Sequence, residues 1–237
     1  ETAPVLVPEV PATAGKTFAT VAISQDASYA LSTDGRVYAW GVNASGQLGT
    51  GTLTGVTIPT LVGGSGALGS KTVVAVAAAV NGSSAYAVTL DGKLFSWGAN
   101  ASGQLALGGS VNTSTPTQVG GALVSEVVTA VAAGSNHVLI LTADGGLYAS
   151  GSNIQGQLGT GSTGTQSNTP VPVSMGALLG KTVVAIAAGH NTSFALSADG
   201  SVYAWGDNST GSMGDGSLVN RFVPVQVAAP QAVAGKL

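Results

Sequence analysis

The side chains best suited to acid–base or metal chemistry are few in this sequence and lie far apart. Among its 237 residues are two histidines, His137 and His190, and no cysteine. The histidines lack the close spacing of a zinc-binding pair, and neither stands beside a nucleophile and an acid in the manner of a catalytic triad. We therefore favour a structural role for His137 over a catalytic one and predict no catalytic residue.

Two acids come closest to a metal site. Asp207 and Asp215 flank one glycine-rich stretch, and carboxylate oxygens are ligands that Ca²⁺ prefers. A calcium site needs about six to eight oxygen ligands, so two acids supply too few. Solvated loop acids are the favoured interpretation, and the sequence predicts no metal and no cofactor.

The charge balance argues against a nucleic-acid partner. The chain has 7 Lys or Arg residues against 10 Asp or Glu residues, a net charge of −3. Phosphate backbones are bound by clustered cations, which this sequence does not offer. The glycine-rich loops that follow the tryptophan positions lack the Gly-Lys-Ser/Thr ending of a phosphate-binding loop.

One motif occurs four times and sets the organisation of the chain. Each copy has an Asp-Gly pair, a short apolar run ending in Trp-Gly or Ser-Gly, an asparagine and a glycine-rich turn. The copies begin at Asp34, Asp91, Asp144 and Asp199, a period of about 55 residues that is typical of propeller repeats. The positions that define the motif are Asp34, Gly35, Trp40, Gly41, Asn43, Gly46, Asp91, Gly92, Trp97, Gly98, Asn100, Gly103, Asp144, Gly145, Gly151, Asn153, Gly156, Asp199, Gly200, Trp205, Gly206, Asn208 and Gly211.

Each repeat carries four short runs with strand patterning. Asp-Gly between apolar runs predicts a tight hairpin, and a run containing proline in each unit predicts an outermost strand, because proline cannot donate to a ladder. The predicted fold is all-β, a β-propeller-type array of four units with about four antiparallel strands each. We expect a single repeat domain over 1–237, divided near 17–71, 72–126, 127–181 and 182–237, with 1–16 supplying an extra Pro-Val strand and a linker.

The motif resembles the repeat of the regulator of chromosome condensation family, here in a bacterial-type sequence. The pattern Asp-Gly-x-Val-Tyr-x-Trp-Gly-x-Asn-x-x-Gly-Gln-Leu-Gly runs through all four units. The resemblance implies a β-propeller with four-stranded blades, usually seven in number, so four units fall short of the family's ring. Three departures stand out: Ala106 replaces a glycine, Ser150 replaces the tryptophan, and Ser212 replaces the glutamine.

The repeated residues are assigned structural roles. We predict that Trp40, Trp97 and Trp205 are equivalent and at least partly buried between neighbouring units, and that Ser150 marks a looser junction. The asparagine and glycine of each turn fit an Asx-type turn followed by a left-handed residue.

Composition points to protein contact rather than catalysis. Charged residues make up 7% of the chain, whereas about a quarter is usual. We expect a non-enzymatic, self-assembling extracellular protein, such as a filament, sheath or surface-array subunit or a half-ring oligomer, that is secreted or lies on a cell surface. The alternative is a propeller module that presents loops to a partner protein. No membrane insertion is expected, because no run approaches the roughly 20 apolar residues of a spanning helix.

The N-terminal run is the candidate assembly edge. Val5, Leu6 and Val7 form an apolar strand pattern without the charged residue that normally protects an exposed edge. We expect another copy of the chain to complete this edge.

Overall fold

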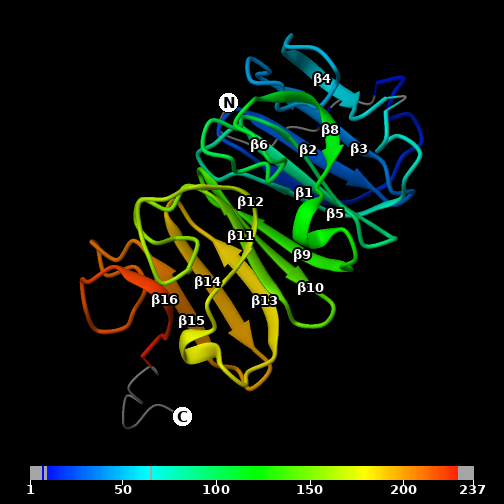
Figure 1. Ribbon diagram of the computed structural model, residues 1–237. Helices are drawn as coiled ribbons and strands as arrows, with labels where there is room; N and C mark the ends of the chain where they lie inside the picture. Colours follow the sequence, from blue (N-terminus) through cyan, green and yellow to red (C-terminus); the bar gives the residue numbers. More distant parts are fainter. Residues whose placement is uncertain (1–6, 8–9, 65, 229–237) are drawn as a thin grey trace, which may run out of the picture.

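The computed structural model describes residue 7 and residues 10–64 and 66–228. In these residues the strands form four antiparallel four-stranded sheets, and each sheet keeps its strands in chain order. We call the sheets blades 1 to 4. They follow one another along the array, from the blue to cyan blade 1 to the yellow to red blade 4 (Figure 1). The predicted all-β propeller-type fold is confirmed.

The blades have nearly identical strand lengths. Blade 1 comprises β1 (Phe18–Ile23), β2 (Ala27–Ser32), β3 (Val37–Gly41) and β4 (Val56–Leu61). Blade 2 comprises β5 (Val73–Ala78), β6 (Ser84–Thr89), β7 (Leu94–Gly98) and β8 (Thr113–Gln118). Blade 3 comprises β9 (Val128–Ala133), β10 (His137–Thr142), β11 (Leu147–Gly151) and β12 (Ser167–Pro172). Blade 4 comprises β13 (Val183–Ala188), β14 (Thr192–Ser197), β15 (Val202–Gly206) and β16 (Arg221–Gln226). The proline-containing strands β4, β8, β12 and β16 are outermost, as predicted.

The hairpin between the second and third strands is built the same way in every blade. In blade 1, Ser32 N–H donates to the carbonyl of Arg36 at 2.8 Å, and Gly35 takes a φ of +79°. The Ser32 hydroxyl also donates to Asp34 Oδ1 at 2.5 Å. Glycine is required because the turn needs a positive φ, which explains the recurrence of Asp-Gly.

The hydrophobic core lies between the blades, in three layers. Tyr29, Leu31 and Leu48 of blade 1 cluster with Phe95 and Trp97 of blade 2. A second cluster joins blades 2 and 3, and a third joins blades 3 and 4. Each blade therefore buries its apolar faces against its neighbours rather than within itself, as expected of a repeat array.

The innermost strands stand side by side. β1 contacts β5, β5 contacts β9, and β9 contacts β13. β1 is the most exposed of them, with Val21 and Ile23 open to solvent at 70% and 71%. In the described ranges the only helices are two short 3₁₀ turns, η1 (Gly121–Leu123) and η2 (Gly176–Leu178), and none is long and apolar enough to cross a membrane.

The predicted extra N-terminal strand lies outside the described residues except for Val7, so it stays a prediction. Residues 10–17 form turns without a strand, and Val7 is exposed outside any strand. Val5 and Leu6 of the candidate assembly edge lie outside the described residues.

Candidate functional site at the blade edges

A glycine-rich loop connects the third and fourth strands of each blade, over 43–51, 100–108, 153–161 and 208–216. Its asparagine holds it together from within. Asn43 is 1% exposed; its Oδ1 accepts the N–H of Leu48 at 2.9 Å and its Nδ2 donates to the carbonyl of Thr52 at 2.9 Å. The Asn43 side chain thus bonds to an N–H five residues further along the chain, so the loop is wider than the predicted Asx turn. Gly46 does take the expected positive φ of +80°.

The loop of blade 1 receives the tryptophan of blade 2. Trp97 Nε1 donates to the carbonyl of Gln47 at 2.8 Å, and the hydroxyl of Tyr29 donates to the same oxygen at 2.7 Å. A Cβ on Gly49 would lie 2.8 Å from Trp97 Nε1, so only glycine leaves room for the indole. Trp97 is fully buried. We call this contact between consecutive blades a seam.

The direction in which the Trp97 side chain points follows from the strand register. In blade 1 the pairing of β3 with β4 shifts between Ala39 and Gly41, and the same shift occurs in the other three blades. The tryptophan position, Trp40 in blade 1, falls in this irregularity. Such irregularities redirect side chains, and here the side chain of Trp97 is turned toward the loop of the preceding blade.

The seam between blades 3 and 4 keeps the tryptophan and adds a histidine. Trp205 Nε1 donates to the carbonyl of Gln157 at 3.0 Å, and the Ser193 hydroxyl donates to the same oxygen at 2.7 Å. Because the Ser193 proton is used there, its oxygen accepts from His137 Nε2 at 3.0 Å. The sequence pattern did not reveal this linkage, since its members come from two blades.

His137 is neutral in this environment. Burial, and secondarily the charge of His190, lower the pKa of His137 to about 4. Among the described residues its Nδ1 has no hydrogen-bond partner, which fits an Nε2–H tautomer with a bare Nδ1 lone pair. His190 is anchored separately, with Nδ1 2.7 Å from the hydroxyl of Ser135. The structural role predicted for His137 agrees with these contacts.

The seam between blades 2 and 3 is built differently. Ser150 stands in the tryptophan position, fully buried, and its hydroxyl lies 2.9 Å from the carbonyl of Gly103 and 2.8 Å from that of Ser167. Ala106, also buried, stands at the position of Gly49 with a φ of +60°. The two departures from the repeat compensate for each other. The Cβ of Ala106 leaves no room for an indole, and Ser150 of blade 3 brings no indole to this position. The prediction that Ser150 marks a looser junction is therefore wrong.

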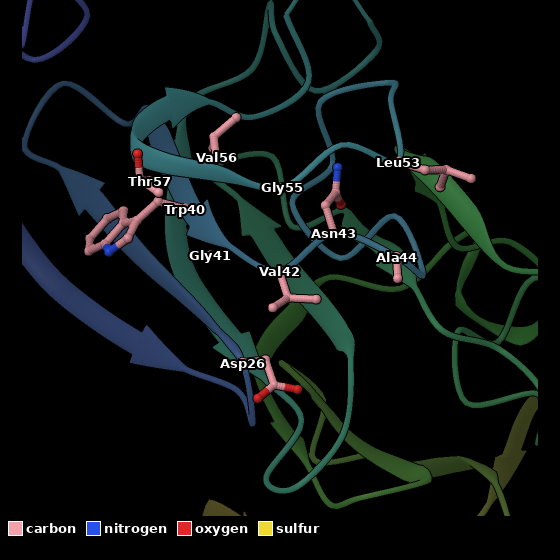
Figure 2. Close-up of a pocket in the computed structure, with 10 residues that line it drawn as sticks. All are labelled: Asp26, Trp40, Gly41, Val42, Asn43, Ala44, Leu53, Gly55, Val56 and Thr57. Atoms are coloured by element: carbon pink, nitrogen blue, oxygen red, sulfur yellow. The ribbon is translucent and has the colours of Figure 1, made fainter.

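At the remaining edge of blade 1, no loop among the described residues lies against the equivalent half-seam. Trp40 is partly exposed, and within the described residues its indole N–H has no acceptor. A pocket of about 650 Å³ opens here, and Figure 2 shows Trp40 and Thr57 at one end of it and Leu53 at the other. Leu53 is 63% exposed. We call this surface the open edge; it is lined by Asp26, Trp40, Gly41, Val42, Asn43, Ala44, Leu53, Gly55, Val56 and Thr57.

The opposite end of the array shows the complementary half. In blades 1 to 3 the Gly-Gln-Leu part of the glycine-rich loop is buried. In blade 4 the corresponding Ser212 and Gly214 are exposed, while Met213 is buried in place of the leucine. The three tryptophans are therefore equivalent in position but not in burial, because burial depends on a preceding loop.

Of the two acids considered for calcium, Asp215 is engaged in contacts within its own loop. The Asp215 side chain is 5% exposed and pairs with Arg221 at 2.7 Å. It also accepts from Asn208 Nδ2 at 3.0 Å. Its pKa is lowered to about 2: burial acts in the opposite direction, and the hydrogen bonds from Ser217 and Arg221 outweigh it. Asp215 is thus a buried acid that holds its loop together rather than a solvated acid. The described residues contain no group of three or more potential metal ligands.

Comparison with known proteins agrees with this architecture. The family model described as RCC1-like domain matches residues 1–236. The chain belongs to the RCC1-like domain family. The resemblance stated from the repeat motif is thereby confirmed.

Relatives of this RCC1-like chain are much longer proteins. The human X-linked retinitis pigmentosa GTPase regulator is 42% identical over 147 residues, which make up 62% of this chain and 14% of that protein. The human E3 ubiquitin-protein ligase HERC2 is 34% identical over 195 residues, 82% of this chain and 4% of that protein. The chain spans a small part of both relatives.

Solved structures share the fold over nearly the whole chain. Human WBSCR16 superposes with a TM-score of 0.81 at 30% identity, covering 91% of this chain and 54% of that one. Prp20p from Saccharomyces cerevisiae gives a TM-score of 0.74 at 25% identity, covering 93% of this chain and 52% of that one. The four blades thus correspond to about half of these solved relatives.

Proposed function

We propose that this RCC1-like array is a protein-binding module that docks partners on its open edge. One observation carries the proposal: Trp97 and Trp205 are each sealed by a loop of the preceding blade, whereas Trp40 faces an open pocket. An aromatic side chain with an apolar body and a free N–H, set among exposed aliphatic groups, is typical of an interface anchor.

The relatives support protein binding as the general role. The solved structure of Prp20p is described with its binding properties to Gsp1p and histones. A second structure holds yeast RCC1 bound to Kap60. The proposal takes from them only that this fold serves protein contact, and it names the open edge as the surface used here.

The proposal includes no catalytic role. The side chains that would carry chemistry are committed to structural contacts, His137 to Ser193 and Asp215 to Arg221. A nucleic-acid partner is not proposed either, since the net charge is −3 and phosphate binding needs clustered cations.

The proposal is tested by substituting Trp40 and measuring affinity for a protein partner. A Gsp1p-type GTPase and core histones are defined probes, and titration calorimetry reports their binding. We expect Trp40→Ser to lower the binding affinity of any partner that uses the open edge by about tenfold or more, as loss of an anchor residue does. Leu90→Ser is the control, because Leu90 is apolar and more exposed than Trp40 but lies on a hairpin of blade 2. A probe that binds both variants equally well uses another surface, which would contradict the proposal.

A second candidate is self-association into an extracellular or cell-surface assembly. It is favoured by the 7% content of charged residues, which leaves few charges to keep copies apart. Under this second candidate function, the protein is bacterial and secreted. Size-exclusion chromatography with light scattering separates it from the first: a strict monomer at high concentration contradicts self-association and leaves binding to other proteins intact.

A further inference from the structure

We propose that Asn81 is a site of spontaneous deamidation, and that its β-linked product loosens the contacts of blade 2 with both neighbouring blades. Asn81 lies in the turn between β5 and β6 and is the chain's only asparagine that is directly followed by glycine. This inference does not depend on the open edge, because β5 of blade 2 has a described blade on each side, with β1 and β9 in contact with it.

The turn between the first and second strands is longer in blade 2 than in the other blades. It spans residues 79–83 there, against 24–26, 134–136 and 189–191. In this longer turn Asn81 is exposed and takes a φ of +56°. Among the described residues, Ala106 is the only other residue besides the glycines with a positive φ. Asparagine adopts this left-handed conformation more readily than most residues, so Asn81 is suited to the turn and is open to solvent.

The packing of the turn against blade 3 explains why glycine follows Asn81. A Cβ on Gly82 would clash with the carbonyl oxygen of Ser135 and would lie 2.9 Å from the Cβ of Ala79. Glycine allows this close approach of two backbones because it has no side chain. For the same reason the nitrogen of Gly82 is less shielded than that of any other residue. The fold therefore keeps the least hindered backbone nitrogen next to the Asn81 side chain.

Deamidation at this pair needs only water as a second reactant. The backbone nitrogen of Gly82 attacks Cγ of Asn81, and the amide nitrogen leaves as ammonia with the proton of the Gly82 N–H. Water then opens the cyclic succinimide. Opening at Cγ gives aspartate, whereas opening at the main-chain carbonyl gives isoaspartate. In isoaspartate the backbone runs through the side-chain carbon and is longer by one carbon atom.

The hydrogen bond of the Gly82 N–H decides when the reaction can occur. This N–H donates to the carbonyl of Ala79 within the same turn, at 3.2 Å, which is the long end of the range for such bonds. The nitrogen is free to attack only when this bond is open. Surface turns open locally without unfolding of the strands, so the folded chain is expected to react, although more slowly than the unfolded chain.

The turn joins blade 2 to the blades on both sides. The N–H of Gln25 in blade 1 donates to the carbonyl of Gly82 at 3.4 Å. The hydroxyl of Ser135 in blade 3 donates to the carbonyl of Val80 at 2.7 Å. These two carbonyls flank Asn81, so an extra backbone carbon at this residue changes the spacing that both contacts need. The isoaspartate form therefore weakens both contacts, whereas the aspartate form keeps the length of the backbone.

The site is tested by peptide mapping with mass spectrometry after incubation of the full chain at mildly alkaline pH, folded or unfolded in denaturant. Asn136 is the internal control, because it is exposed in the equivalent turn of blade 3 but precedes the buried His137. In the folded chain we expect Asn81 to convert about tenfold faster than Asn136 or more, a barrier difference of about 1.4 kcal/mol. Asn81→Gln is expected to suppress conversion at this position, because its longer side chain would have to form a larger ring.

Two results would overturn the assignment of the site. One is an equal rate at Asn81 and Asn136 in the folded chain. The other is an unconverted Asn81 in the folded chain over a time in which the unfolded chain converts, which would show that the turn does not open enough to react.

The loosening of the blade contacts is tested on the separated products. Chromatography isolates the isoaspartate form from the incubated chain, and its melting curve is compared with those of the untreated chain and of Asn81→Asp. We expect the isoaspartate form to melt lower by about 2 °C or more and Asn81→Asp to stay close to the untreated chain. An isoaspartate form that melts like the untreated chain would contradict the loosening. Both measurements leave the Trp40 surface unchanged, so they are independent of the proposed docking function.

Discussion

Trp97 and Trp40 occupy the same position in neighbouring blades, yet their surroundings are opposite. Trp97 is fully buried, donates to the carbonyl of Gln47, and stands edge-on to Tyr29 with ring centroids 6.4 Å apart. Trp40 sits in an otherwise similar blade and lines an open pocket. The difference lies in the preceding loop, which is present for Trp97 and lacking for Trp40 among the described residues. A blade thus supplies half of each seam and depends on its neighbour for the other half.

Removing the two indoles is expected to give the largest and most divergent effects. Trp97→Ala empties a sealed space between blades 1 and 2 and should lower the free energy of unfolding by about 3–5 kcal/mol. Trp40→Ala removes a partly exposed side chain and should cost a small fraction of that in the monomer. Denaturant titration in dilute protein measures both values. Equal losses would show that the open edge is sealed in solution.

The seam between blades 3 and 4 is expected to respond to pH, unlike the seam between blades 1 and 2. Burial beside His190 lowers the pKa of His137 to about 4, against about 6.5 when unfolded. The unfolded chain therefore binds more protons between these values. Stability should be full above pH 6.5 and fall by up to about 3 kcal/mol as pH drops toward 4.

His137→Gln is the control for this pH dependence. Glutamine keeps a donor toward Ser193 but does not titrate, so the slope of unfolding free energy between pH 4 and 6.5 should flatten. An unchanged slope would place the responsible group elsewhere. Hydrogen bonds lower the pKa values of Asp34, Asp91 and Asp199 in the folded chain. Their stabilisation is lost as pH falls below about 5, so the slope between about pH 5 and 6.5 is the part that reports on His137.

The compensation between Ser150 and Ala106 offers a sharper test of the seam. Ser150→Trp alone should destabilise the chain by about 1–3 kcal/mol, as overpacking does, because the Cβ of Ala106 occupies the path of the indole. Adding Ala106→Gly should recover much of that loss. A double-mutant cycle measures the coupling, expected at about 0.5–3 kcal/mol for residues in contact. Independent effects of the two substitutions would contradict the shared site.

Much of the fold could be predicted from the sequence because its signals are local. Asp-Gly pairs between apolar runs fixed the hairpins, and proline placed the outermost strands. The prediction about Ser150 failed because it treated each unit by itself. Ala106 and Ser150 were both visible as departures, but only the arrangement of blades brings a loop of one unit against a strand of the next.

The proposed docking surface was harder to predict for the same reason. Trp40 has the same sequence context as Trp97, and its partial exposure reflects the lack of a covering loop among the described residues. The pairing of Asp215 with Arg221, and the linkage from His137 through Ser193 to Gln157, likewise join residues that no sequence spacing marks. A recurring signal did exist for the ion pairs, since Lys16, Lys71 and Lys181 precede three of the four Asp-Gly turns by a similar interval.

Those ion pairs are expected to give the smallest effects. Lys71 pairs with Asp91 at 2.7 Å and Lys181 with Asp199 at 2.7 Å, and all four side chains are well exposed. Blade 3 has Glu126 in the lysine position and no such pair. Exposed pairs contribute little and are screened by salt. Lys71→Ala should therefore leave the melting temperature nearly unchanged, and the contrast with Trp97→Ala defines the seams as the source of stability.

The most direct test of the central claim is acrylamide quenching of tryptophan fluorescence. The chain has three tryptophans, of which Trp97 and Trp205 are fully buried. In dilute protein, wild type should show a quenchable component that Trp40→Phe abolishes, leaving emission that resists acrylamide. Equal quenching of wild type and Trp40→Phe would mean that Trp40 is as sealed as the others, and the open edge would not exist.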